Sequence, residues 1–251
     1  MIKESRRAFR ELVLVFAFIT ATTIAISALG RMPFVGEYQH LFIGFLFLFT
    51  SLRMAQREDQ GARRYGIDLY GILAPPLEDT PPGFLGSLRD LISVFRQALP
   101  VALKETLLAL IVALVVFPIF TAGFFFWHAP QHPFTFQPPS NFFSYLFAQF
   151  VMVGLPEEAL FRGYFQTRLR DVYPLETRLF GVGFPPIAIA VQAVLFATVH
   201  FVVDLNLLRL AVFFPALLFG ALRAWRGGIG AAIVFHALCN LVSDILVRGW
   251  L

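Results

Sequence analysis

The sequence predicts an all-α fold, a polytopic bundle of about seven transmembrane helices with the N-terminus inside the cell. Three properties of the composition indicate this class. Of the 251 residues, 58% are hydrophobic and only 14% are charged, and the mean hydropathy is +0.72. A soluble domain needs far less apolar surface for its core. Long apolar runs with short polar breaks recur along the chain, which indicates one compact membrane domain.

Seven apolar segments approach the roughly 20 residues that a helix needs to cross the hydrocarbon layer. We expect these spans at residues 12–30, 37–54, 107–127, 141–170, 184–203, 205–225 and 228–247. The second is the weakest, because its uninterrupted apolar core is short enough for a re-entrant segment. The basic, then apolar N-terminus resembles a signal peptide, but the run is long and lacks a good cleavage site, so we expect an uncleaved first span.

Basic residues indicate which ends of the spans face the cytoplasm. Of the 20 lysines and arginines, only Arg31, Arg209 and Arg248 fall in segments assigned to the outer face. Cytoplasmic segments of membrane proteins carry such an excess of positive charge. We therefore expect the N-terminus inside and the C-terminus outside. Without the second span, the large basic loop would lie on the wrong face of the membrane.

The chain divides into two expected parts. Residues 1–106 contain the first two spans, a basic cytoplasmic loop with a proline-rich linker at 66–83, and an amphipathic helix that begins at Phe84. The apolar stripe of that helix suits the membrane surface, and equally a position folded back on the protein. Residues 107–251 form the expected membrane core, which carries the motifs EExxxR, FxxxH and HxxxN.

The stretch GLPEEALFRGYF, residues 154–165, places ionisable side chains inside the fourth span. Charged groups at membrane depth cost on the order of 3 kcal/mol each on insertion scales, so they indicate a functional site. Glu158 and Arg162 are four residues apart, and we expect them to form an ion pair. Glu157 lies about 100° round the helix without such a partner, which leaves its carboxylate free to act on another group.

Two further spans carry polar side chains with a spacing of four residues. FATVH places Phe196 and His200 on one face of the fifth span, and HALCN places His236 and Asn240 on one face of the seventh. A lone intramembrane histidine is usually a hydrogen-bonded packing residue, but polar groups on three helices favour a site. At about 1.5 Å per residue, these polar groups and Glu157 lie about 12 to 23 Å from the inner helix ends. They can therefore meet in one layer.

At these residues the chain resembles the CAAX prenyl protease and bacteriocin-processing family of intramembrane endopeptidases, over roughly residues 142–244. The motifs EEALFR, FATVH and HALCN follow the family pattern in order and on separate spans. No single motif is specific, but the ordered set is. The N-terminal half is similar only in spanning the membrane, and family members with eight spans differ from the seven expected here.

The resemblance implies a metal-free, glutamate-dependent peptidase. Glu157 would activate a water as general base, and His200 would bind and orient that water. His236 and Asn240 would donate hydrogen bonds to the developing oxyanion. Peptide hydrolysis needs groups of these types, a base for the water and donors where negative charge develops. Three residues would support the geometry: Glu158, Arg162 and Phe196.

Three other interpretations are open. Glu157, His200 and His236 also fit a zinc set with water in the fourth position, although no HExxH helix supports it. The same pocket would serve a non-catalytic membrane protein that binds a peptide or confers immunity. A small transporter with a proton relay is the third, although no internal repeat is found. Cys239 faces away from the His236 stripe, so we do not expect a cysteine nucleophile.

The expected partners are a protein or peptide substrate, with a lipidated or hydrophobic C-terminus as one form, and membrane lipids. Nucleic acid is not expected, because the net charge of +4 is not gathered into a basic stripe with stacking aromatics. Short loops and the lack of an organelle signal favour a bacterial inner membrane, where prenylation is not the default. We expect the active site to open toward the cytoplasmic side.

Overall fold

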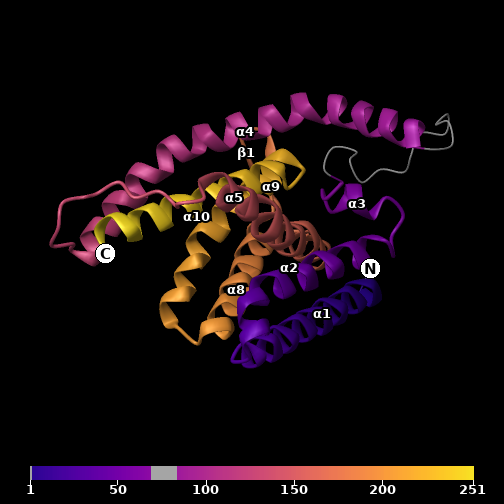
Figure 1. Ribbon diagram of the computed structural model, residues 1–251. Helices are drawn as coiled ribbons and strands as arrows, with labels where there is room; N and C mark the ends of the chain where they lie inside the picture. Colours follow the sequence, from indigo (N-terminus) through magenta and orange to yellow (C-terminus); the bar gives the residue numbers. More distant parts are fainter. Residues whose placement is uncertain (1, 69–83) are drawn as a thin grey trace.

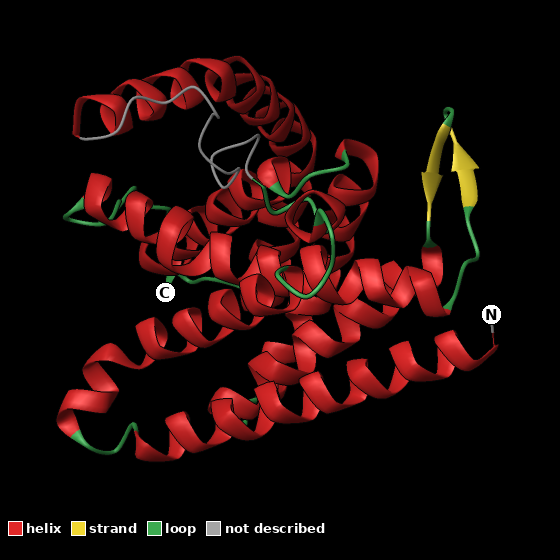
Figure 2. Cartoon of the chain, turned by 90° about the vertical axis from the view of Figure 1, so that its right-hand side faces the viewer, coloured by secondary structure: helices red, strands yellow, loops and turns green. Residues whose placement is uncertain are grey.

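The structure, a computed structural model, describes residues 2–68 and 84–251. It is nearly all-α, which confirms the predicted fold class. One short antiparallel hairpin, β1 (Thr177–Leu179) and β2 (Val182–Phe184), interrupts the helices. Figure 2 shows the hairpin projecting from the helices on the side where the N-terminus lies. Most of the predicted linker at 66–83 lies outside the described residues.

The N-terminal part of the chain is a helical pair. α1 (Ile2–Leu29) and α2 (Pro33–Ala55) run antiparallel, and the four-residue α3 (Gly61–Arg64) follows (Figure 1). Pro33 occupies the first turn of α2, where its missing N–H leaves no hydrogen bond unmade. The first two predicted spans are therefore helices in the structure.

α4 (Phe84–His128) is a single helix of 45 residues, where the sequence led us to expect an amphipathic helix and a separate span. Pro100 and Pro118 lie inside it, and it passes through residues 106 and 107 without a break. In Figure 1, α4 arches over one side of the molecule. It packs along the last helix of the chain, with Ala109 against a buried cluster that includes Phe235.

The fourth predicted span is a run of alternating α-helical and π-helical turns. Its pieces are α5 (Phe142–Ala148), η2 (Gln149–Gly154), α6 (Leu155–Glu158), η3 (Ala159–Phe165) and α7 (Gln166–Val172). Pro156 has no N–H to donate to the preceding turn, which favours a wider turn just before it. π-Helical turns occur frequently at functional sites.

The C-terminal part contains three long helices. α8 (Pro186–Asp204) is followed by the 3₁₀ turn η4 (Leu207–Val212), then α9 (Phe213–Arg226) and α10 (Gly230–Trp250). Gly227 ends α9 with φ 75°, a left-handed conformation that glycine adopts without strain. The chain thereby reverses its direction between α9 and α10 within a few residues.

Five helices among the described residues are long and apolar enough to cross a membrane. They are Arg6–Leu29, Ile92–His128, Pro186–Asp204, Leu207–Arg226 and Gly230–Trp250. The predicted count of seven is not confirmed, because α2 and the run α5 to α7 are not among the five. α2 carries Glu37, Gln39 and His40 near its start, which lowers its hydropathy. The run α5 to α7 is divided by its π-helical turns.

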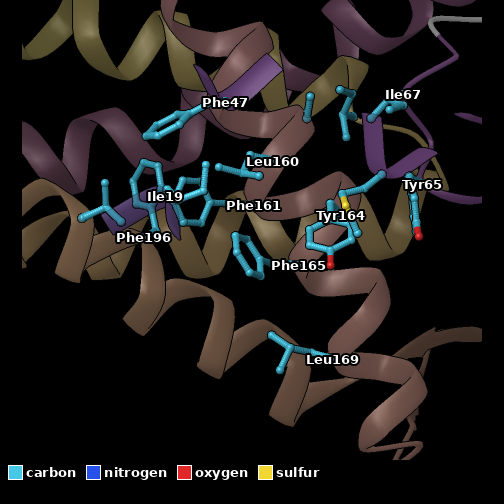
Figure 3. Close-up of a cluster of buried hydrophobic side chains, with 14 of the residues drawn as sticks. Ile19, Phe47, Tyr65, Ile67, Leu160, Phe161, Tyr164, Phe165, Leu169 and Phe196 are labelled. Atoms are coloured by element: carbon cyan, nitrogen blue, oxygen red, sulfur yellow. The ribbon is translucent and has the colours of Figure 1, made fainter. Parts of the chain in front are cut away.

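η3 lies at the centre of the hydrophobic core (Figure 3). Leu160, Phe161 and Phe165 are completely buried. The Phe161 ring packs edge-to-face with the rings of Phe47 and Phe196, at centroid distances of 5.8 and 5.0 Å. Such aromatic pairs add to the stabilisation that burial alone provides. The polar motif of the fourth span is therefore anchored by its own neighbouring residues.

Gly44 lies where α2 crosses η2, and a Cβ atom there would lie 2.7 Å from the carbonyl oxygen of Met152. We expect Gly44→Ala to lower the free energy of unfolding by about 1–3 kcal/mol, because overpacking forces the backbones apart. Thermal unfolding of the protein in detergent, followed by tryptophan fluorescence, measures the loss. Gly123→Ala is the matched control, since a Cβ at Gly123 meets nothing within 4 Å. Equal melting temperatures for the two variants would contradict the close approach.

Candidate active site

A cavity of about 460 Å³ lies among α2, the run α5 to α6, α8 and α10. Its walls include the four residues that the sequence analysis assigned to catalysis: Glu157, His200, His236 and Asn240. The three motifs lie on separate helices, so only the folded bundle brings these side chains together. The supporting residues Glu158 and Arg162 are completely buried behind the cavity wall.

The predicted ion pair between Glu158 and Arg162 is confirmed. Arg162 Nη1 donates to Glu158 Oε1 at 2.9 Å, one helical turn away. The same Oε1 lies 2.7 Å from His236 Nδ1. A carboxylate oxygen accepts hydrogen bonds, so Nδ1 of His236 carries the proton and donates it. Glu158 thus links Arg162 of η3 to His236 of α10.

Two phenylalanines enclose the Arg162 guanidinium. Its central carbon lies 4.3 Å from the ring centroid of Phe196 and 4.8 Å from that of Phe219. The faces of aromatic rings attract cations, most strongly where water is excluded. Phe196 also lies 4.3 Å from the His200 ring, and Phe219 stacks on His236 at 4.8 Å with an interplanar angle of 14°. Phe196 was predicted as a supporting residue, whereas Phe219, on α9, was not.

Glu157 points into the cavity, away from the ion pair. Its Oε2 atom is buried and has no hydrogen-bond partner among the described residues. Nε2 of His236 lies 3.6 Å from this oxygen, and Nε2 of His200 lies 3.9 Å from it. These separations exceed a direct hydrogen bond, and a polar contact of this length is the kind that one water bridges. The three side chains therefore face one common point.

Hydrogen bonds on the far side of each ring fix both histidines. His200 Nδ1 lies 3.0 Å from the carbonyl oxygen of Phe196, which can only accept, so Nδ1 carries the proton. His236 is fixed in the same way by Glu158. In both rings the bond at Nδ1 leaves Nε2 directed at Glu157. Such partners set the orientation and the tautomer of a functional histidine.

Asn240 is held by a residue that sequence reasoning missed. Its Nδ2 donates to Oε1 of Gln149 at 2.7 Å, and both residues line the cavity. Gln149 begins the π-helical turn η2, eight residues before Glu157 in the chain. Its place inside an apolar span was the one signal that could have identified it, since amides are uncommon at that depth.

The cavity reaches toward one end of the bundle. Its deep wall is buried, with side-chain exposures of 15% for Glu157 and 5% for His236. Asp204 and Arg209, at the end of α8 and in η4, are 38% and 51% exposed. This end is opposite to α3 and the N-terminus of α1, where most basic residues lie. The sequence analysis expected the opening on the cytoplasmic side of the membrane.

The residues proposed for zinc do not make a metal site by the usual criteria. Among residues 2–68 and 84–251, no group of three or more His, Cys, Asp or Glu side chains is placed to hold a metal ion. Nevertheless, two Nε2 atoms and one carboxylate oxygen do face one point, as described above. Cys239, the single cysteine, does not line the cavity.

Arg162→Ala would leave the carboxylate of Glu158 buried without its cation, so we expect the free energy of unfolding to fall by about 3–5 kcal/mol. Arg248→Ala is the matched control, because Arg248 and Asp244 form a pair of the same i,i+4 spacing at the surface. Its expected loss is about 0.5 kcal/mol or less. Unfolding titrations in mixed micelles measure both.

If Arg162→Ala does not fold, Arg162→Lys serves in its place. Lysine keeps the charge but not the planar group between the two rings, so an intermediate loss is expected. Losses of equal size for Arg162→Lys and Arg248→Ala would contradict the role given to the buried pair.

Comparison with known proteins gives a match in the same region. A family model described as type II CAAX prenyl endopeptidase, Rce1-like, matches residues 138–242, which contain all three motifs. No curated protein and no solved structure matches the chain. The matched family is a family of peptide hydrolases, and the apolar helices make the chain an integral membrane protein. Residues 138–242 thus match the CAAX prenyl protease and bacteriocin-processing family of intramembrane endopeptidases, in the part of the chain that carries the three motifs.

Proposed function

We propose that the chain hydrolyses a peptide bond of a membrane-associated protein or peptide with a water molecule activated by Glu157. One observation carries the proposal. The buried Oε2 atom of Glu157 has no hydrogen-bond partner among the described residues, and the Nε2 atoms of His236 and His200 face it at 3.6 and 3.9 Å. This arrangement suits a polar molecule held among three side chains.

The water would donate its two hydrogens to two acceptors. Glu157 Oε2 accepts one, and Nε2 of His200 accepts the other, because Nδ1 of His200 already donates to the Phe196 carbonyl. A lone pair of the water oxygen then points away from both acceptors toward the scissile carbonyl carbon. As the C–O bond forms, the proton passes to Glu157, which acts as general base.

His236 and Asn240 would stabilise the oxyanion. Donation from Nε2 of His236 requires a second proton on that ring, since Nδ1–H is bound to Glu158. Asn240 uses one Nδ2 hydrogen on Gln149 and keeps the other for the oxyanion. Preorganised donors of this kind contribute strongly in a site shielded from water.

Collapse of the tetrahedral intermediate would complete the reaction. The C–N bond breaks, and the proton held by Glu157 passes to the departing nitrogen, which leaves as a neutral amine. The carbonyl re-forms as the new carboxyl terminus, and Glu157 is again a carboxylate. The same residue thus acts first as base and then as acid.

The substrate is a protein or peptide, with a lipidated or hydrophobic C-terminus as one form, and the proposed location is a bacterial cell membrane. Two alternatives keep the same residues. A zinc ion on Glu157, His200 and His236 would supply a metal-bound water. A non-catalytic protein would hold a peptide in the cavity without cutting it. Inhibition of cleavage by a zinc chelator would support the first alternative. The absence of cleavage products would support the second.

Glu157→Gln is expected to abolish cleavage, because an amide cannot take the proton from water. The measurement is cleavage of a reporter with candidate C-terminal tails, in membranes that contain the wild type or the variant, with and without a zinc chelator. Glu37→Gln, at an exposed position on α2, is the control and should cut like the wild type. Cleavage by Glu157→Gln would refute the base assignment, and chelator sensitivity of the wild type would support zinc.

Gln149→Leu is expected to lower kcat/KM by about 10-fold, the scale on which a residue acts when it only positions a functional group. The reason is that Asn240 loses the acceptor that orients its amide. A double-mutant cycle with Asn240→Ala tests the route of the effect. The double variant should be no slower than Asn240→Ala alone. Additive losses would show that Gln149 acts independently of Asn240.

A further inference from the structure

We infer that the active-site cavity opens on the extracytoplasmic side of the membrane, and that the substrate is a polypeptide segment presented at the outer surface. The substrate part rests on the proposed function, whereas the side of the opening rests on geometry and charge alone. Four observations lead to it: a closed end, an open end, the distribution of arginines between them, and the depth of the cavity.

The end of the bundle nearest α3 is closed by interactions among distant segments. Arg168 of α7 lies 3.3 Å from both Glu11 of α1 and Glu58. Ile229 N donates to the carbonyl oxygen of Gly66 at 3.1 Å, which joins the start of α10 to the segment after α3. These contacts connect the first, second, fourth and last predicted spans at one end.

Tyr65 strengthens this closed end. Its hydroxyl donates to Glu58 Oε1 at 2.7 Å, and burial raises the pKa of Tyr65, so the hydroxyl keeps the proton that it donates. Between Tyr65 and the catalytic glutamate lies the aromatic layer of η3. Leu160, Phe161 and Phe165 have no exposed surface. A substrate approaching from this end would have to displace the core of the protein.

The opposite end is polar and open. The cavity wall passes along α8 from His200 to Asp204 and along α10 from His236 to Val247, in both cases toward the C-terminal end of the helix. At the mouth, Arg209 Nε donates to Asp204 at 2.6 Å, outside the buried wall. In Figure 1 the C-terminus of α10 and the N-terminus of α1 lie on opposite sides of the molecule.

Charge orients these two ends in the membrane. The closed end carries most arginines of the described chain, on α1, around α3, on α7 and at the end of α9. The open end carries Arg31, Arg209 and Arg248, and two of these three are paired with aspartates. Positive charge collects on the cytoplasmic side of membrane proteins. The closed end is therefore cytoplasmic, and the mouth faces outward.

Depth limits the form of the substrate. From His236 to Val247, α10 rises about 16 Å at 1.5 Å per residue. An extended chain covers that distance with about five residues at 3.3 Å each. An α-helix is about 10 Å wide with its side chains, so a chain that reaches Glu157 fits better in extended form. The substrate is thus an unstructured tail or loop at the outer surface.

Thiol labelling tests the side of the opening. The single cysteine is first removed by Cys239→Ser, and Ser243→Cys then places a thiol on the cavity wall. The matched control is Arg178→Cys, on the exposed strand β1 at the closed end. We expect a charged thiol reagent to label Ser243→Cys at least about tenfold faster in right-side-out than in inverted vesicles, because charge does not cross the hydrocarbon layer. Arg178→Cys should show the reverse preference.

Faster labelling of Ser243→Cys in inverted vesicles would overturn the inference, as would its lack of reaction in both preparations. Labelling requires no turnover, so its result is independent of the Glu157→Gln experiment. The substrate is tested with one reporter tail, either exported to the outer surface or retained in the cytoplasm. Cleavage of the exported form alone is expected. Cleavage of the cytoplasmic form alone would overturn the assignment of the substrate.

Discussion

The completely buried pair of Glu158 and Arg162 is the interaction on which the rest of the site depends. Two charges removed from water are tolerated only when each is compensated in good geometry. Arg162 meets this condition with Glu158 and with the faces of Phe196 and Phe219. The same Glu158 oxygen binds Nδ1 of His236. Loss of the pair would therefore release the His236 ring as well as a buried charge.

The adjacent glutamates Glu157 and Glu158 have different surroundings, so each can have a role of its own. Glu158 faces the protein and binds Arg162 and His236 through one oxygen, whereas Glu157 faces the cavity and has no hydrogen bond to either of these side chains. The π-helical turns η2 and η3 flank this pair of residues. The wider turns change the directions in which successive side chains point. They do so here, where Glu157 faces the cavity and Glu158 faces the protein.

Sequence reasoning reached the all-α class, the pair of Glu158 and Arg162 and the meeting of three motifs, since spacing along a helix fixes which side chains share a face. It missed Gln149 and Phe219, because their roles come from contacts across helices, which no local pattern encodes. It also separated the amphipathic segment from the third span, although neither Pro100 nor Pro118 ends α4. Hydropathy counts apolar residues but does not detect where a helix continues.

Hydrolysis inside a membrane requires water at a site whose surrounding core excludes water. The packed layer of Leu160, Phe161 and Phe165 excludes water on one side of the site, which strengthens the electrostatic interactions of the buried pair. The polar mouth near Asp204 and Arg209 offers water and substrate a route from the other side. Glu157 lies at the boundary between these regions, partly buried yet in contact with the cavity. A carboxylate placed deeper would lack water, and one placed at the mouth would lose the fixed histidines, so this layer is the place where a carboxylate meets both.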